Sequence, residues 1–307
     1  MERRAPSESP FVAWYREFEP HPALRSRVRA LFSFTWCIEP NPSRRLSMDM
    51  AFGAADAFSA PSFADASASI VFDLGAILRS NGSWHDDSAS LGGHVIGPLP
   101  CVSPVTTAFR GELPAMVGAY LRPGQLSAFA HVSSPEASGL TIPIDDLWCS
   151  AESLGEQLST LGERARLDLL ERVLLRRMSE PRERSSSVDV RGLTTCVSRA
   201  DGSVSVESLA HWAGVSRQQL TRVFRERVGV SPKLYCRLAR FRSLVPRVFG
   251  DADHARVACE AGYADQSHMI AEFREFSGLT PQMLATRRWF HPFTVARRAL
   301  DSWSPPG

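Results

Sequence analysis

The sequence has 307 residues, of which 44% are hydrophobic and 22% charged, and its formal net charge is +2. These values exclude a disordered chain and leave room for two globular domains. No apolar run reaches the roughly 18 residues of a membrane-spanning helix, and the N-terminal residues MERRAPSESPFVAWYREFEP lack the apolar core of a signal peptide. We therefore expect a cytoplasmic protein.

Residues 11–150 show strand patterns. Gly, Pro, Ser and Asn separate short apolar or alternating runs, namely ALFSFTW, SIVFDLG, HVIGPL, MVGAYLRP and GLTIPI. This regularity predicts an antiparallel sandwich or barrel. Leucines and valines then recur at helical spacing over residues 151–178, which predicts one or two amphipathic helices.

A polar stretch, SEPRERSSSVD, follows these helices and marks a linker at residues 181–187. It separates an N-terminal domain, residues 1–180, from a helical region at 188–290 and a tail at 291–307. The helical region carries most of the positive charge, since residues 217–242 hold eight basic residues and one acid, Glu226. Such a field attracts a polyanion, although a solvated basic helix face would look the same.

The helical region contains an internal repeat. GVSRQQLTRVFRERVGVSP, residues 214–232, matches GYADQSHMIAEFREFSGLTP, residues 262–281. In each copy a glycine ends one helix, apolar residues four apart place the next helix on it, and Ser-Pro or Thr-Pro starts a third. This order of helix, short turn and second helix is the helix-turn-helix unit.

The second helix of the first copy presents a polar face, because Leu220 and Phe224 are expected to point inward. Arginine suits guanine edges, glutamine suits adenine edges, and the threonine methyl suits thymine. We therefore predict base contacts from four residues of this face, Arg217, Gln218, Thr221 and Arg222.

The helical region resembles the DNA-binding domain of the AraC-type transcriptional regulators. LAHWAGVSRQQLTRVFRERVGVSPKLYCRLARFR and ACEAGYADQSHMIAEFREFSGLTPQMLATRR carry this resemblance over about a third of the chain. It implies two helix-turn-helix units joined by a linker helix at about Pro232 to Val245. Their recognition helices, near Arg217–Arg227 and Gln266–Phe276, would enter successive major grooves.

On this resemblance, Gln266 and Ser267 would contact bases in the second unit. Four cations are predicted to contact phosphate, which positions a protein without reading sequence: Arg225, Arg227, Lys233 and Arg237. The second unit departs from the family at Ala271, where a basic residue is usual, with Ile270 beside it. Glu272 and Glu275 add acid there. Pro246 is expected to end or kink the linker helix.

The N-terminal half resembles a poorly characterised domain of a subset of AraC-type regulators. This implies an α+β protein: a cupin-like antiparallel β-barrel with trailing helices, serving effector sensing, dimerisation or both, before an all-α domain. The resemblance implies double-stranded DNA as partner in a bacterial cell. It leaves RNA polymerase, a small-molecule effector and a second copy of the chain as further candidate partners.

No catalytic or metal site is indicated. His21, His85, His94 and His131 are scattered without the spacing of a cupin metal site, and no nucleotide-binding or hydrolase motif occurs. The six cysteines lie far apart, which favours reduced, mostly buried thiols over a disulfide or zinc framework. Trp14, Trp36, Phe72 and Trp148 would form an apolar core or line a pocket.

We therefore predict a sequence-specific DNA-binding transcriptional regulator that is not an enzyme and holds no cofactor. The alternatives are a ligand-binding or enzymatic cupin-like protein whose helical domain binds no specific DNA, and a protein–protein adaptor. The positive charge of residues 217–242 disfavours the adaptor.

Overall fold

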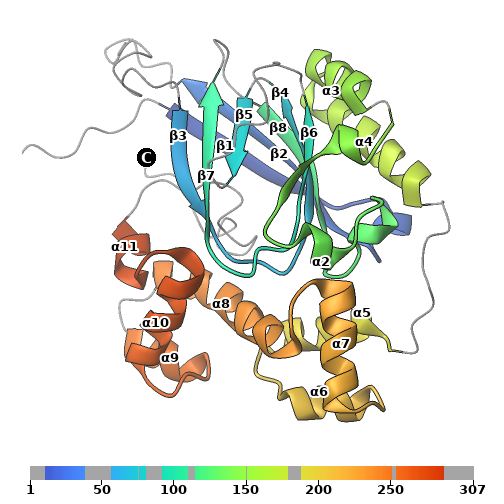
Figure 1. Ribbon diagram of the computed structural model, residues 1–307. Helices are drawn as coiled ribbons and strands as arrows, with labels where there is room; N and C mark the ends of the chain where they lie inside the picture. Colours follow the sequence, from blue (N-terminus) through green and yellow to red (C-terminus); the bar gives the residue numbers. More distant parts are fainter. Residues whose placement is uncertain are drawn as a thin grey trace, which may run out of the picture.

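The computed structural model describes residues 11–38, 57–74, 76–80, 92–109, 115–149, 151–178, 188–250 and 254–286. Its first half is a β-domain with helices, and its second half is entirely helical (Figure 1). The predicted α+β class is confirmed.

The β-domain contains two antiparallel sheets. The larger has the strand order β1-β2-β8-β4-β6-β9, formed by β1 (Phe11–Phe18), β2 (Val28–Ile38), β8 (Ala115–Leu121), β4 (Ser69–Leu74), β6 (Gly93–Ile96) and β9 (Thr141–Pro143). The smaller has the order β3-β7-β5, formed by β3 (Ala57–Ser62), β7 (Ser103–Phe109) and β5 (Ala76–Ser80).

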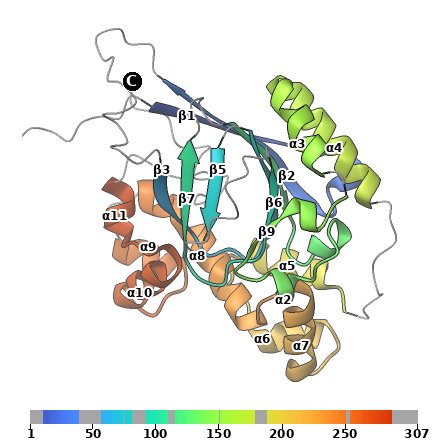
Figure 2. The ribbon, with the colours of Figure 1, turned by 45° about the horizontal axis from the view of Figure 1, so that its top comes forward.

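The smaller sheet lies on one side of the larger sheet, and two helices lie on the other (Figures 1 and 2). These helices are α3 (Ala151–Thr160) and α4 (Glu163–Met178), as their leucine periodicity predicts. Every residue of β4 and β8 is buried, because both faces of these central strands are covered. This explains why their sequences are nearly continuous apolar runs.

The core beneath α3 and α4 contains two of the four aromatic residues considered above. Phe72 and Trp148 are buried with ring centroids 6.2 Å apart, and the Trp148 indole Nε1 donates a 2.8 Å hydrogen bond to the Phe129 carbonyl. They are core residues here. The side chains of Trp14 and Trp36 lie outside the described residues.

Short helical turns connect the strands: η1 (Pro22–Leu24), η3 (Leu126–Ala128), α2 (Ser134–Ala137) and η4 (Ile144–Asp146). The helical domain follows with α5 (Val190–Arg199), α6 (Val206–Trp212), α7 (Arg217–Val228), α8 (Pro232–Gly250), α9 (His254–Glu260), α10 (Gln266–Ser277) and α11 (Pro281–Thr286). None of the helices in the described ranges is long and apolar enough to cross a membrane.

Of the two expected effects of Pro246, the end of the linker helix is wrong, and a kink stays a prediction. Helix α8 continues through Pro246 to Gly250. Proline removes one amide donor, but the apolar face of this helix is buried: Phe241, Leu244, Val245 and Val248 are all at most 2% exposed. The burial of this face offsets the lost hydrogen bond.

The cysteines are less buried than expected. Cys101, Cys149 and Cys259 are free and exposed, whereas Cys236 is buried. Burial raises the pKa of the Cys236 thiol to about 11. That thiol is therefore unreactive at neutral pH.

Candidate nucleic-acid interface

Two helix-turn-helix units stand at equivalent positions of the repeat. In the first, Gly214 (φ +64°) ends α6, and the Ser216 hydroxyl accepts a 3.1 Å hydrogen bond from the Gln219 amide to start α7. In the second, Gly262 (φ +75°) ends α9, and the Asp265 carboxylate accepts a 2.7 Å bond from the His268 amide to start α10. The predicted turns and recognition helices are confirmed as structure.

Helix α7 buries the residues that the repeat predicts. Leu220 and Phe224 are fully buried, and the Phe224 ring meets that of Tyr235 on α8 edge to face at 5.9 Å. This contact fixes the rotation of α7 about its axis, and therefore fixes which residues face solvent.

The opposite face of α7 contains the predicted base-contact residues. Arg217, Gln218 and Arg222 are exposed. Thr221 is half-buried, and its hydroxyl donates a 2.8 Å bond to the Arg217 carbonyl, which leaves its methyl group for contact. Arg222 lies 4.0 Å from Glu226, and the two side chains are 67% and 59% exposed, so this pair does not hold the arginine in place.

Three predicted phosphate contacts border this face. Arg225 and Lys233 are exposed, and Arg227 is half-buried. The side chains lie on α7 and at the start of α8, so a DNA backbone passing this unit meets cations on two elements.

The second unit has a less charged face. Gln266 and Ser267 are exposed in the first turn of α10, and Ala271 is exposed one turn later. Ile270 is half-buried and packs against the core, so it belongs less to the outer face than the sequence suggests. The exposed uncharged polar side chains Gln266 and Ser267 lie at the helix N-terminus, where helix-turn-helix proteins contact base edges.

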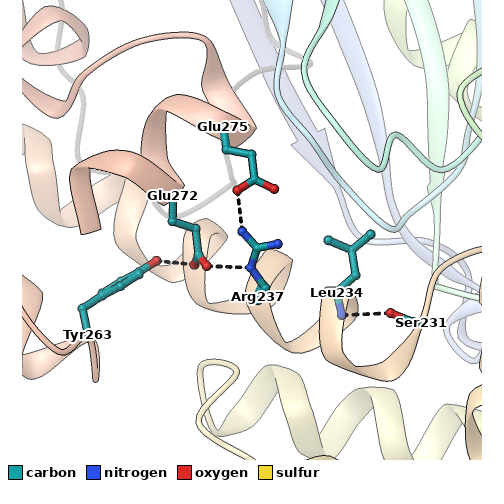
Figure 3. Close-up of polar contacts among 6 residues, drawn as sticks. All are labelled: Ser231, Leu234, Arg237, Tyr263, Glu272 and Glu275. Atoms are coloured by element: carbon teal, nitrogen blue, oxygen red, sulfur yellow. Dashed lines mark hydrogen bonds and ion pairs between the residues drawn. The ribbon is translucent and has the colours of Figure 1, made fainter. Parts of the chain in front are cut away.

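Arg237, the fourth predicted phosphate contact, is engaged by two carboxylates. Its Nε donates a 2.7 Å bond to Glu272 Oε2, and its Nη2 donates to Glu275 at 2.5 Å (Figure 3). The Tyr263 hydroxyl donates a 2.8 Å bond to the other oxygen of Glu272. These contacts give Arg237 structural partners within the helical domain.

This network joins the linker helix α8 to the second unit. Glu272 is only 3% exposed, yet both its oxygens accept hydrogen bonds from charged or hydroxyl donors. Burial lowers the pKa of Arg237, but the hydrogen bonds and charges of Glu275 and Glu272 outweigh it and hold that pKa above its ordinary value. Burial, and then Glu272, raise the pKa of Tyr263. The acid that seemed to weaken this unit is thus paired with a cation.

The helix N-caps of the two units could have been found from the sequence. Ser216 and Asp265 occupy equivalent positions of the repeat and are both N-cap residues. The pairing of Arg237 with Glu272 had no such signal, because the residues are 35 positions apart and on different helices.

The described residues contain no group of three His, Cys, Asp or Glu side chains that could hold a metal ion. His94 instead lies 3.2 Å from Asp73, a buried residue of β4 whose pKa is raised by burial. His21 and His131 are exposed, and His85 lies outside the described residues.

Residues 209–287 match the family model described as a helix-turn-helix domain. No curated protein sequence matches the chain. Among solved structures, ToxT from Vibrio cholerae O395 is similar at 10% identity and a TM-score of 0.42, covering 76% of this chain and 95% of that one. Unsaturated fatty acid-bound wild-type ToxT from Vibrio cholerae strain SCE256 is similar at 11% identity and a TM-score of 0.42, covering 92% and 97%. Structural similarity at this level carries no conclusion about function.

The matched region, the paired units and the exposed polar face of α7 define a class: this is a DNA-binding transcriptional regulator. The two units, joined by the long helix α8, lie in the region that matches the helix-turn-helix family model.

Proposed function

We propose that α7 reads base edges in one major groove and that α10 makes fewer contacts in the next. The observation that supports this is the composition of the exposed face of α7, where Arg217, Gln218 and Arg222 project from a helix held by a buried core. Thr221 adds a methyl contact. Gln266 and Ser267 are the base contacts of the second unit.

Arg225, Arg227 and Lys233 are the phosphate contacts of this proposal. Arg237 is removed from that set, because its guanidinium is already engaged by two carboxylates. A phosphate contact at Arg237 would require both ion pairs to break.

The experiment is substitution of Arg222 by Ala, with binding measured to a selected operator and to random DNA. Loss of a base contact weakens operator binding by about 1–3 kcal/mol and leaves random binding nearly unchanged. Arg199→Ala, a change at an exposed arginine of α5, is the matched control and should alter neither. Equal loss on both DNAs would make Arg222 a phosphate contact.

The N-terminal domain is proposed to control this binding by sensing a small effector, by dimerisation or by both. RNA polymerase is the partner through which a regulator in a bacterial cytoplasm would act, and no catalysis is required of the chain. Sedimentation of the full chain tests dimerisation. Thermal unfolding with small-molecule sets tests effector binding, because a ligand of the folded state raises the unfolding temperature.

A further inference from the structure

The segment between β3 and β4 belongs to the first domain but is buried against the second. Phe63, Ala64 and Ala66 lie in the same hydrophobic cluster as the core of the helical domain. The Phe63 ring meets that of Phe241 on α8 edge to face at 5.8 Å. Residues 63–67, the bracing segment, therefore contribute to the core that holds the linker helix.

Hydrogen bonds fix the bracing segment to both domains. Arg242 on α8 donates a 3.1 Å hydrogen bond to Asp65 Oδ1, and this pair is about 30% exposed on each side. The Ala64 amide donates a 2.9 Å bond to the carbonyl of Phe276, near the end of α10. Asp65 also exchanges two backbone hydrogen bonds with Leu99, which fixes the segment to the β-domain.

The first unit is held at a different place. A Cβ built on Gly229, the C-cap of α7, would lie 2.9 Å from the Ser134 carbonyl of α2 and 3.3 Å from Pro98. A Cβ built on Gly124 would lie 3.2 Å from the Arg227 carbonyl. The β-domain is thus in close contact with the C-terminal end of α7, where α2 lies (Figure 1).

The β-domain contacts both recognition helices at their C-terminal ends. Gly229 and Gly278 are the left-handed C-caps of α7 and α10, and Gly278 lies beside Val102 of the β-domain. The N-terminal turns, with Arg217 on α7 and Gln266 on α10, are exposed. The β-domain therefore holds both helices by the ends that face away from base contacts.

We propose that the N-terminal domain is a two-point brace that sets the separation and angle of the recognition helices, with Asp65 as a positioning residue. This rests on the proposed function of α7 and α10. Two rigidly linked binding units engage DNA together only when the spacing of its half-sites fits, whereas loosely linked units tolerate several spacings. The N-terminal domain thereby specifies half-site spacing although it touches no base.

The test uses the full chain and a series of operators in which base pairs are added or removed between the half-sites. Wild-type affinity should fall by about tenfold or more away from the best spacing. Asp65→Arg places two cations together, so its affinity should be lower at the best spacing and vary by only about threefold across the series. Asp65→Arg combined with Arg242→Asp reverses the pair and should restore the wild-type profile.

Glu19→Arg is the matched control, because it makes the same charge change at an exposed pair with Arg25 in the β-domain. Its profile should equal that of the wild type. If Asp65→Arg fails to fold, as judged by thermal unfolding, Arg242→Leu breaks the same pair from α8 and should broaden the profile likewise.

An unchanged spacing profile in folded Asp65→Arg or Arg242→Leu protein would overturn the brace. Tighter DNA binding by these variants at every spacing would also overturn it, because the contact between the two domains would then oppose DNA binding. Absence of specific binding by the wild type would instead overturn the proposed function itself.

Discussion

Replacing Arg237 by Met separates the two roles considered for this residue. The substitution keeps the aliphatic stem but removes the guanidinium, which leaves the carboxylate of Glu272 buried at 3% exposure with the Tyr263 hydroxyl as its hydrogen-bond donor. Breaking a fully buried ion pair costs about 3–5 kcal/mol. The cost is smaller here, because Arg237 is 29% exposed and the Tyr263 hydroxyl still donates a hydrogen bond to Glu272. We therefore expect the lower end, about 3 kcal/mol of unfolding free energy.

The assay is urea unfolding followed by circular dichroism, alongside DNA binding at several salt concentrations. Arg256→Met is the control: its pair with Glu260 is 57% and 50% exposed, so its loss should cost no more than about 0.5 kcal/mol. Adding Glu272→Gln to Arg237→Met removes the stranded charge and keeps an acceptor for Tyr263. It should recover about 1 kcal/mol or more.

The opposite outcome would assign Arg237 to DNA. If Arg237→Met unfolds like the wild type while the salt dependence of DNA binding loses a slope of about one, Arg237 contacts phosphate. The sequence-based assignment would then be correct, and the ion pairs of Figure 3 would contribute nothing to stability.

Three further changes test the fold. Burial raises the pKa of Asp73, so the folded state binds the proton of this carboxyl more tightly than the unfolded state does. The unfolding free energy therefore falls as the pH rises above the pKa of about 3.9 that Asp73 has in the unfolded state. Asp73→Asn should therefore raise the unfolding temperature at pH 7, with a gain that shrinks toward about pH 4; an equal gain at both would contradict it. Gly229→Ala should cost more than Gly214→Ala: both have positive φ, worth about 1–2 kcal/mol, but only at Gly229 would the new Cβ meet a carbonyl, at 2.9 Å. Equal losses of unfolding free energy for the two variants would show that the β-domain shifts to make room for the new Cβ at position 229. Pro246→Ala supplies an amide that can donate to the Arg242 carbonyl one turn earlier, and should raise the unfolding free energy by about 1–3 kcal/mol; a loss of unfolding free energy would mean that the proline ring packs favourably.

The sequence predicted best what depends on near neighbours. Helices α7 and α10 begin and end where glycines, caps and apolar residues four apart place them. The strands with apolar runs were equally visible, whereas β7, with the sequence SPVTTAF, carried too little apolar pattern to identify. Local signals decide local structure, and polar strands in a small sheet lack them.

What could not be predicted depends on contacts between distant positions. Arg242 meets Asp65 across 177 positions, and no periodicity connects the two. For the same reason Arg237 looked like one more cation of a basic helix, although tertiary packing turns it toward Glu272. Helix faces followed from the sequence, but the partner of each charge on them did not.

We propose that this chain reads DNA sequence through two unequal units. Selection of bound sites from random duplexes by the full chain tests it directly. We expect an enriched motif with one strong half, read by α7, and one weak half at a fixed distance, read by α10. Recovery of no motif, or of a motif that Arg222→Ala leaves unchanged, would contradict it.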